Sequence, residues 1–243
     1  MDWFFSDASD IGEMHLITGE DAVHITKSLR MSVGESITLC DSSRTEHLCR
    51  IERITPEGVL VRAVSRQECT HEPDVRVSLY MSLTKGDKPE TVIQKAVELG
   101  VYRIVPVLTD RCVSRPDPGS AGKKLQRYRK IALQAAMQSQ RAVIPEVKPM
   151  ITLREAAEEL DDYDVSIVFY EGGGLPLRLI LDRPEYKNIA LFIGPEGGFE
   201  EREIELLREK GTAVATLGQR ILRAETAPLA AIAAIMFHTG NLE

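Results

Sequence analysis

The sequence lacks the features of a membrane-spanning or secreted protein. No stretch of its 243 residues approaches the roughly 18 consecutive apolar residues that a membrane-spanning helix needs. No basic segment precedes a long apolar run near its start, so we expect no signal peptide. Apolar residues still make up 43% of the chain, which is enough for a packed core and excludes wholesale disorder. These observations predict a folded cytoplasmic protein that has no membrane partner.

Cysteine is scarce, and its spacing indicates neither a disulfide framework nor a metal site. The four cysteines, Cys40, Cys49, Cys69 and Cys112, form no Cys-x-x-Cys pair. Cys69 and His71 lie close together, but no second pair with the spacing of zinc ligands follows. We therefore expect reduced thiols that pack as small apolar residues, and no bound metal.

A net positive charge is also missing, which at first argues against a nucleic-acid partner. The chain carries a net charge of −7. Both ends of the chain are acidic, whereas residues 75–150 hold 14 basic and 6 acidic side chains. Phosphate binding depends on the local density of lysine and arginine, so this middle third remains a candidate nucleic-acid surface.

Apolar runs and turn residues divide the chain into two parts. Three short apolar runs predict the strands of a small β-rich domain, at Ser36–Cys40, His47–Ile54 and Val59–Val64. One helix interrupts this domain, and Thr18 is its expected cap. The segment Ser65–Asp74 is polar and has no periodicity. We therefore place the first domain at residues 1–72 and the second at residues 73–243.

The second part alternates strands with helices. Its apolar strand segments lie at Val75–Leu83, Tyr102–Leu108, Val165–Phe169, Ile189–Ile193 and Ala213–Leu217. Its helical segments lie at Thr91–Leu99, Lys123–Gln138, Glu201–Lys210 and Ala227–Phe237. This alternation predicts an α/β fold with a parallel sheet covered on both faces.

A glycine-rich loop between a strand and a helix is the strongest site candidate. It contains Gly194, Pro195, Glu196, Gly197 and Gly198. Its glycines permit positive φ or a close approach of a ligand. The acidic residues within the loop and in the following helical turn would repel a phosphate. We expect a neutral, zwitterionic or cationic ligand, and a tight turn without any ligand is the alternative.

Two further loops also follow strands. Leu217–Ala227 leads into the last apolar helix, and Glu171–Gly174 follows the strand Val165–Phe169. Ligands of open α/β sheets bind beyond the carboxyl ends of the strands, so the three loops predict one shared site. Within the first of these loops, Arg223 and Glu225 are either catalytic side chains or a plain structural ion pair.

Basic side chains gather in the positive middle third. They occur in Lys85–Lys88 and in Lys123–Lys130, where five of the eight residues are basic, and Gln138–Arg141 follows. A solvated helix face is the commoner meaning of such a pattern. Its coincidence with the positive third favours contact with RNA.

In this order, the motifs resemble the RsmE family of small-subunit ribosomal RNA methyltransferases, within the SPOUT group. The resemblance runs nearly end to end and rests on Trp3–Phe5, His24–Arg30, Val33–Glu35, Lys85–Lys88, Gln94–Ala96, Glu98–Val101, Gly194–Phe199 and Leu217–Thr226. The family commonly has a basic residue where this chain has Trp3, glycine where it has Gln140, and asparagine where it has Ala142.

The resemblance implies a fold, a cofactor and a partner. An N-terminal PUA-like β-barrel that binds RNA would precede an α/β domain with a deep trefoil knot. The cofactor would be S-adenosyl-L-methionine, with its adenine held by backbone groups of Leu217–Leu222. The family works as a homodimer through the last helix. The substrate would be 16S ribosomal RNA or the small ribosomal subunit, methylated at ring N3 of a uridine.

The resemblance also implies which residues form the sites. The expected cofactor-binding residues are Glu171, Gly172, Gly194, Pro195, Glu196, Gly197, Gly198, Leu217, Gly218, Ile221 and Leu222. The expected RNA-binding residues are Arg30, Lys85, Lys88, Lys123, Lys124, Arg127, Ser139 and Arg141.

Methylation at N3 sets chemical demands on the site. Uridine N3 carries a proton at neutral pH, so the enzyme must hold the base, position the donor and stabilise the uracil anion. Arg223 is the candidate for that stabilisation, and Glu225 either orients Arg223 or assists the proton. The reaction requires no metal, and solvent is an alternative proton acceptor.

Two other functions remain open from the sequence. One is methylation of a different RNA position, such as a ribose hydroxyl. The other is a ribosome-assembly factor that binds RNA without catalysis. Binding of S-adenosylhomocysteine separates the enzyme from the assembly factor.

Overall fold

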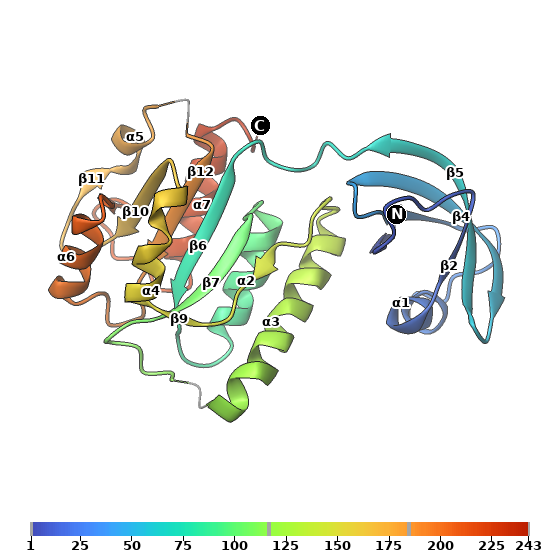
Figure 1. Ribbon diagram of the computed structural model, residues 1–243, viewed down its shortest axis with the longest axis horizontal. Coiled ribbons are helices and arrows are strands. Elements are labelled where there is room, and N and C mark those ends of the chain that lie inside the picture. Colours follow the sequence, from blue (N-terminus) through green and yellow to red (C-terminus); the bar gives the residue numbers. More distant parts are fainter. Residues whose placement is uncertain (1, 116–117, 184–185, 243) are drawn as a thin grey trace. The chain divides into compact units, whose positions relative to one another are not determined.

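Two separate β-sheets divide the chain. The computed structural model describes residues 2–115, 118–183 and 186–242. One unit consists of Met1–Glu72 with Ala136–Ile144, and the other of Pro73–Ala135 with Pro145–Glu243 (Figure 1). The first unit thus includes a short segment from far along the chain, which the sequence did not indicate. In the described ranges, no helix has both the length and the apolar character that a membrane crossing requires.

The first unit is built on a five-stranded sheet. Its strands are β1 (Trp3–Phe5), β2 (Met14–Ile17), β3 (Ser36–Cys40), β4 (Thr45–Thr55) and β5 (Gly58–Glu68). Their order is β1-β3-β4-β5-β2, and every pairing except β1 with β3 is antiparallel. Alternate residues such as Ile37 and Leu39, or Val59 and Val61, point into the core, because side chains on a strand alternate between its two faces.

The helix of the first unit is present but begins without a side-chain capping hydrogen bond. α1 (Gly19–Val23) continues into the π-helical turn η1 (His24–Ser28). Thr18 occupies the N-cap position as predicted, but its side chain makes no capping hydrogen bond. Acidic residues in the first turn still complement the helix dipole. The buried side chain of Ile25 anchors the turn in the core of the first unit.

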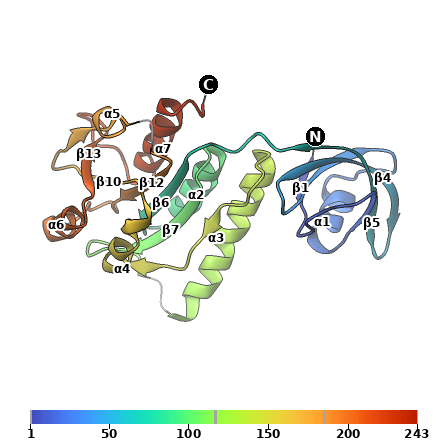
Figure 2. The ribbon, with the colours of Figure 1, turned by 45° about the horizontal axis from the view of Figure 1, so that its top comes forward.

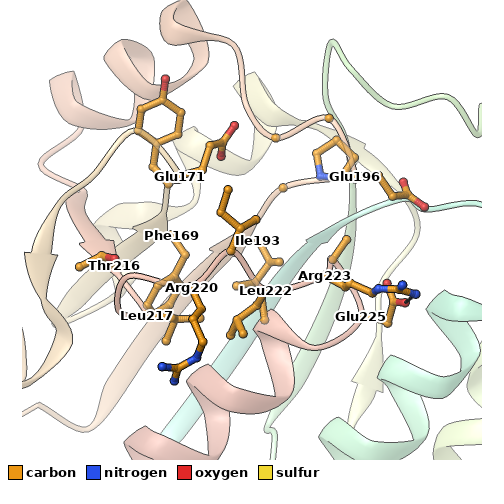
Figure 3. A pocket seen from close by; sticks show the side chains of 18 of the residues that line it. Phe169, Glu171, Ile193, Glu196, Thr216, Leu217, Arg220, Leu222, Arg223 and Glu225 are labelled. Carbon is orange, nitrogen blue, oxygen red and sulfur yellow. Dashed lines mark ion pairs between the residues drawn. The ribbon is translucent and has the colours of Figure 1, made fainter.

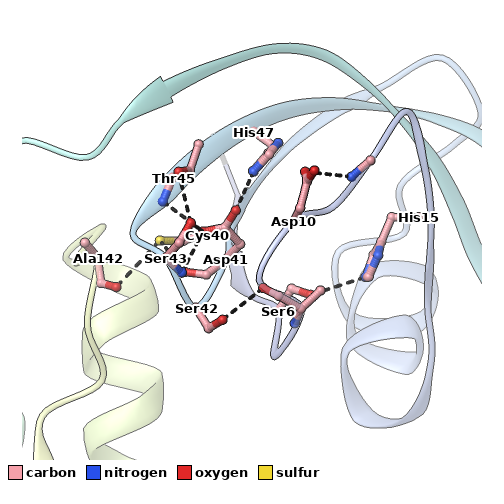
Figure 4. Close-up of polar contacts among 12 residues, drawn as sticks. Ser6, Asp10, His15, Cys40, Asp41, Ser42, Ser43, Thr45, His47 and Ala142 are labelled. Atoms are coloured by element: carbon pink, nitrogen blue, oxygen red, sulfur yellow. Dashed lines mark hydrogen bonds and ion pairs between the residues drawn. The ribbon is translucent and has the colours of Figure 1, made fainter.

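A buried carboxylate fixes the turn between β3 and β4 (Figure 4). Asp41 accepts hydrogen bonds from the backbone N–H groups of Ser43 and Thr45, and its other oxygen lies 2.8 Å from Nε2 of His47. Burial opposes the charge of Asp41, but the hydrogen bonds from Thr45, His47 and Ser43 outweigh it and lower the pKa of the carboxyl. The hydrogen bonds to the charged Asp41 therefore fix the turn.

The second unit contains an eight-stranded parallel sheet. Its strands are β6 (Arg76–Ser82), β7 (Arg103–Leu108), β8 (Glu146–Val147), β9 (Ile151–Thr152), β10 (Val165–Phe169), β11 (Leu175–Pro176), β12 (Asn188–Ile193) and β13 (Ala213–Thr216). The order is β11-β13-β10-β12-β6-β7-β8, with β9 also paired to β7. The predicted α/β fold with a parallel sheet is confirmed.

Helices cover both faces of this sheet (Figures 1 and 2). They are α2 (Lys88–Glu98), α3 (Pro118–Gln138), α4 (Leu153–Glu158), the 3-10 turn η2 (Leu160–Asp162), α5 (Leu177–Ile180), α6 (Glu201–Glu209) and α7 (Ala227–His238). α4 and α6 pack on one face, against the stacked rings of Tyr80 and Phe192. α2 and α7 pack together on the other face, where α7 contacts β6.

The end of α3 carries a backbone conformation that explains one departure from the family pattern. Gln140 has a φ of 56°, in the left-handed region. The N–H of Arg141 bonds to the carbonyl of Ala136, and that of Gln140 to the carbonyl of Met137. These two bonds form the helix-ending arrangement that favours glycine at its left-handed position. A non-glycine residue is strained there, which accounts for the glycine common in the family.

Replacing Gln140 with glycine is therefore expected to stabilise the protein. The left-handed conformation costs a non-glycine residue about 1–2 kcal/mol, partly offset by the greater freedom of an unfolded glycine, so the net gain is about 0.5–1 kcal/mol. Denaturant unfolding measures it. Gln134→Gly, on the exposed middle of α3, is the control and should destabilise by about 1 kcal/mol. Equal destabilisation by both changes would contradict the strain.

Candidate active site

Three loops that leave neighbouring parallel strands enclose one cavity (Figure 3). β13, β10 and β12 lie side by side, and the loops at their carboxyl ends line a cavity of about 610 Å³. The lining residues are 169–171, 193–198 and 216–225, with Lys88 and Ala227. The structure thus brings together the three loops that the sequence singled out.

Most residues expected to bind the cofactor line this cavity, and Gly172 does not. A Cβ atom at Gly172 would lie 2.3 Å from the ring of Tyr170. This glycine therefore leaves room for a neighbouring side chain, and it is Tyr170 that reaches the cavity wall. The apolar side chains of Phe169 and Ile193, at the ends of β10 and β12, also line the cavity, although the sequence reasoning did not select them.

The two adjacent glycines of the loop after β12 are explained by two different neighbours. Gly198 has a φ of +69°, and a Cβ there would lie 1.9 Å from Oε1 of Glu171. At Gly197, a Cβ would lie 3.3 Å from the Cβ of Arg111. An added Cβ at Gly197 would therefore crowd Arg111, and the predicted role of Gly197 in cofactor binding stays a prediction.

Arg111, which the sequence reasoning missed, holds the glycine-rich loop from outside. Its Nη1 donates to the carbonyl of Gly197 at 2.7 Å, and its Nε and Nη2 donate to the carboxylate of Glu200 at 2.8 and 3.1 Å. The hydrogen bond to Glu200 is the main cause of a raised pKa at Arg111. Its position three residues after the end of β7 was the available signal, since loops at this edge of the sheet converge.

Acidic side chains satisfy the start of α6. Glu203 is buried, and its carboxylate accepts from the backbone N–H of Glu200 at 2.8 Å and from that of Asp110 at 2.9 Å. Backbone donors at a helix start are what a phosphate would otherwise use. The cavity is therefore unsuited to a phosphate at this point, in agreement with the expectation from the sequence.

One lysine joins two carboxylates at the edge of the cavity. Nζ of Lys88 lies 3.1 Å from Glu196 and 3.3 Å from Glu225. Burial opposes the charge of Glu196, but hydrogen bonds from its own backbone and from Lys88 lower its pKa below the usual value. The buried Oε2 of Glu225 is the oxygen that faces Lys88, and this ion pair is its contact. Lys88 thus supports the cavity, and its predicted contact with RNA stays a prediction.

Arg223 lies on the cavity rim with its side chain 83% exposed (Figure 3). Its Nη1 is 3.9 Å from Oε1 of Glu225, at the outer limit of an ion pair. Such an exposed, long contact contributes about 0–1 kcal/mol at most. A purely structural role is therefore weakly supported, and the guanidinium remains accessible to a substrate.

Comparison with known proteins identifies the chain. Residues 71–236 match the family described as the RNA methyltransferase domain, and residues 17–64 match the RNA methyltransferase PUA domain. The chain belongs to the RNA methyltransferase domain family. The ribosomal RNA small subunit methyltransferase E of Bacillus subtilis is 34% identical to it, over 92% of this chain and 90% of that protein.

Two solved structures share the fold of this RNA methyltransferase over nearly their whole length. The methyltransferase E of Neisseria gonorrhoeae bound to S-adenosyl methionine has a TM-score of 0.90 and 32% identity, and 98% of each chain is covered. A methyltransferase of Legionella pneumophila in complex with the bound cofactor SAM has a TM-score of 0.89 and 30% identity, with 97% of each chain covered. These two methyltransferases therefore share the fold of both units of this chain.

The expected RNA-binding residues of this RNA methyltransferase fall on both units. Lys123, Lys124 and Arg127 share the first half of α3, where Lys123 and Arg127 are exposed. Arg127 pairs with Glu90 at 2.6 Å, and Nζ of Lys124 lies 5.8 Å from the ring centre of Tyr128. These contacts orient the two side chains without burying their charges.

The other expected RNA contacts are more scattered. Lys85 is exposed beside the cavity, and its backbone N–H bonds to Glu196 at 3.3 Å. Arg30 is exposed on the first unit and has a left-handed backbone. Ser139 is partly buried at the end of α3. Lys85 and Arg30 remain accessible to RNA, each on its own unit.

Among the expected RNA-binding residues, Arg141 is the one that the structure buries. It is 4% exposed, and its guanidinium donates to both oxygens of Glu72 at 2.6 and 3.1 Å. Oε1 of Glu72 also accepts from the backbone N–H groups of Ala142 and Val143. A buried arginine in such a bidentate pair has a structural role, because its charge is already satisfied. It therefore does not present itself to RNA.

The segment that carries Arg141 packs firmly on the first unit. Ala142 joins Trp3 and Cys40 in a buried cluster, and the Cys40 thiol donates to the carbonyl of Ala142 at 3.6 Å (Figure 4). The asparagine that is common in the family at this position is larger and polar, and it would be buried here. The small side chain of Ala142 thus suits the packing of the first unit.

Proposed function

We propose that this chain transfers a methyl group from S-adenosyl-L-methionine to ring N3 of a uridine in 16S ribosomal RNA. The observation that carries the proposal is the cavity formed by the loops after β10, β12 and β13, in a chain whose solved relatives include two with S-adenosyl methionine bound. We further propose that residues 1–72 act as the RNA-binding PUA-like domain and residues 73–243 as the catalytic domain, working in the cytoplasm where ribosomal subunits are assembled.

The cavity suits a cofactor that is zwitterionic at one end, cationic at sulfur and aromatic at the other end. Phe169, Ile193 and Leu222 supply an apolar wall for a flat base. Backbone groups of Leu217–Leu222 supply the polar contacts at the rim of that wall. The carboxylates of Glu171 and Glu196 favour a positive charge nearby. When bound, the cofactor supplies the methyl group.

Arg223 supports the chemistry at the uracil ring. Loss of the N3 proton places negative charge on the uracil oxygens, and a donor aimed at that developing charge lowers the barrier. The exposed guanidinium on the cavity rim meets this requirement, and Glu225 limits its movement. Lys88 holds Glu225 and Glu196 in place as a positioning residue. Solvent or Glu225 receives the proton.

A knotted chain and a homodimer complete the proposal. The three loops that close the cavity come from adjacent parallel strands at the C-terminal end of the second unit, as a deep trefoil knot of this group would require. The helix α7 is nearly all apolar, and its Phe237 is 66% exposed. A second copy of the chain would cover this face, which supports the dimer through the last helix.

Single-turnover methylation of 16S ribosomal RNA, followed by mass spectrometry of its nucleosides, tests the proposed function. N3-methyluridine is the expected product. A ribose-methylated nucleoside would instead support the other RNA methylation. If calorimetry detects no binding of S-adenosylhomocysteine, the chain is an assembly factor without catalysis and the proposal fails.

Reversing the charge of Lys123, Lys124 and Arg127 to glutamate is expected to weaken RNA binding without changing cofactor affinity. Each lost phosphate contact should reduce the slope of log affinity against log salt by about 0.7–0.9. Binding titrations at several salt concentrations measure both quantities. The matched control reverses three exposed basic residues elsewhere on the second unit, Arg154, Arg208 and Lys210. An equal loss of RNA affinity in the control would show that the effect comes from net charge alone.

A further inference from the structure

Three side chains of kinds that can ligate a metal converge on the first unit, whereas the proposed active site belongs to the second unit. They are Glu46 on β4, and Cys69 and His71 just after β5. One ligand atom from each, a carboxylate oxygen, Sγ and Nδ1, lies within 4.8 Å of the other two. Strand pairing explains the convergence, because Glu46 lies opposite Gln67 in the β4–β5 ladder and Cys69 follows two residues later.

The separations of these atoms match the ligand spacing of a tetrahedral metal. Sγ of Cys69 is 3.7 Å from Nδ1 of His71, which is 3.5 Å from Oε1 of Glu46. Zinc bonds of about 2.0–2.3 Å at tetrahedral angles place neighbouring ligand atoms about 3.3–3.8 Å apart. One ion can therefore reach all three atoms with little rearrangement.

Glu46 points independently to a cation. Glu46 is 7% exposed, so its carboxylate is largely removed from water. Oε2 accepts a hydrogen bond from Gln67 at 3.0 Å, whereas the buried Oε1 has the 3.5 Å contact with Nδ1 of His71 but accepts no hydrogen bond from any residue within the described ranges. A buried carboxylate oxygen without a partner is costly, and a bound cation removes that cost.

We propose that Glu46, Cys69 and His71 bind a zinc ion, with water as the fourth ligand. A thiolate, an imidazole and a carboxylate together suit zinc better than magnesium or calcium, which prefer oxygen alone. The ion ties the chain after β5 to strand β4. It thereby fixes the segment that leads out of the first unit at Glu72.

Two groups must change for the ion to bind. Nδ1 of His71 lies 3.0 Å from the carbonyl of Gln140, and it must release that contact to ligate the metal. The Cys69 thiol must lose its proton, whereas burial, assisted by the nearby Glu46, raises its pKa to about 12. Zinc affinity should therefore increase with pH, because ligand protons compete with the metal.

Titration of the reduced, chelator-treated full-length protein with Co²⁺ and then Zn²⁺ tests the site. The parent is expected to bind one equivalent of Co²⁺ with a sulfur-to-cobalt charge-transfer band, which Zn²⁺ then abolishes by displacement. Cys69→Ser should remove the band, and His71→Gln and Glu46→Gln should each weaken Zn²⁺ binding by about tenfold or more. Zn²⁺ should raise the melting temperature of the parent but not that of Cys69→Ser.

Two matched controls isolate the site. Cys112→Ser removes a thiol from the second unit, and His24→Gln removes an exposed imidazole from the first. Both variants should keep the charge-transfer band and the Zn²⁺ affinity of the parent. The absence of saturable binding in the folded parent, or an unchanged band in folded Cys69→Ser, would overturn the proposal.

Discussion

Replacing Arg223 with alanine should lower the single-turnover rate of RNA methylation by about a hundred- to a thousandfold. This is the typical effect of removing one donor that faces the charge developing in a transition state, and it corresponds to roughly 3–4 kcal/mol. Arg223 belongs to the loop after β13 and lies on the rim of the cavity, where a splayed-out uracil would meet the methyl donor.

The same substitution should leave stability and cofactor affinity nearly unchanged. The side chain is 83% exposed, and its contact with Glu225 is 3.9 Å long. Melting curves and calorimetry with S-adenosylhomocysteine measure these two quantities beside the rate. Arg208→Ala, which removes an exposed arginine from α6, is the control and should methylate at the parent rate. A normal rate for Arg223→Ala at saturating cofactor would remove Arg223 from the chemistry.

Replacing Gly198 with alanine should weaken binding of S-adenosylhomocysteine by about tenfold or more. The left-handed backbone costs a non-glycine residue about 1–2 kcal/mol. The loop relieves this strain by leaving the conformation that lines the cavity, and each 1.4 kcal/mol needed to restore that conformation lowers the affinity tenfold. The new Cβ would also lie 1.9 Å from the carboxylate of Glu171. That carboxylate is the flexible end of a side chain, so it moves away from its place in the cavity while the fold survives.

Gly211→Ala separates backbone strain from the effect on the cavity. Gly211 also has a positive φ, at +81°, but it follows α6, and an added Cβ meets no described atom within 4 Å. This variant should lose a similar amount of stability and keep the cofactor affinity of the parent. If Gly198→Ala binds S-adenosylhomocysteine as tightly as Gly211→Ala does, the loop after β12 does not hold the cofactor.

Carboxylates and cationic side chains lie together around the cavity. Glu171, Glu196 and Glu225 all line it, and Lys88 compensates two of them. Arg220 and Arg223 also line the cavity, so its three carboxylates are balanced by three cationic side chains.

The sequence by itself determined most of the longer strands, the main helices and the three loops of the cavity, but it missed the short strands β1, β2, β8, β9 and β11. These features depend on local properties of the chain: alternating apolar residues, glycine at turns, and acidic residues at the start of a helix. The loop Gly194–Phe199 could be selected in this way because its glycines and its glutamates lie within a few residues of one another. Converging loops then follow from the rule that parallel strands end at one edge.

Only the tertiary structure decided which charged groups meet. Lys88 contacts Glu196 and Glu225 because β12 pairs with β6, and Arg111 reaches Gly197 from the loop after β7. Pairings between distant segments leave no periodic trace in the sequence, since each partner looks locally like a solvated charge.

Pairing between distant segments also explains why the structure gives some residues a role other than the predicted one. Arg141 resembles an exposed basic residue in a basic region, yet it is buried against Glu72 once Ala136–Ile144 packs on the first unit. Cys69 and His71 lacked a third ligand in the sequence, and the β4–β5 ladder supplies Glu46. Local patterning therefore determined the elements, while burial and ion pairing depended on the long-range order of the strands.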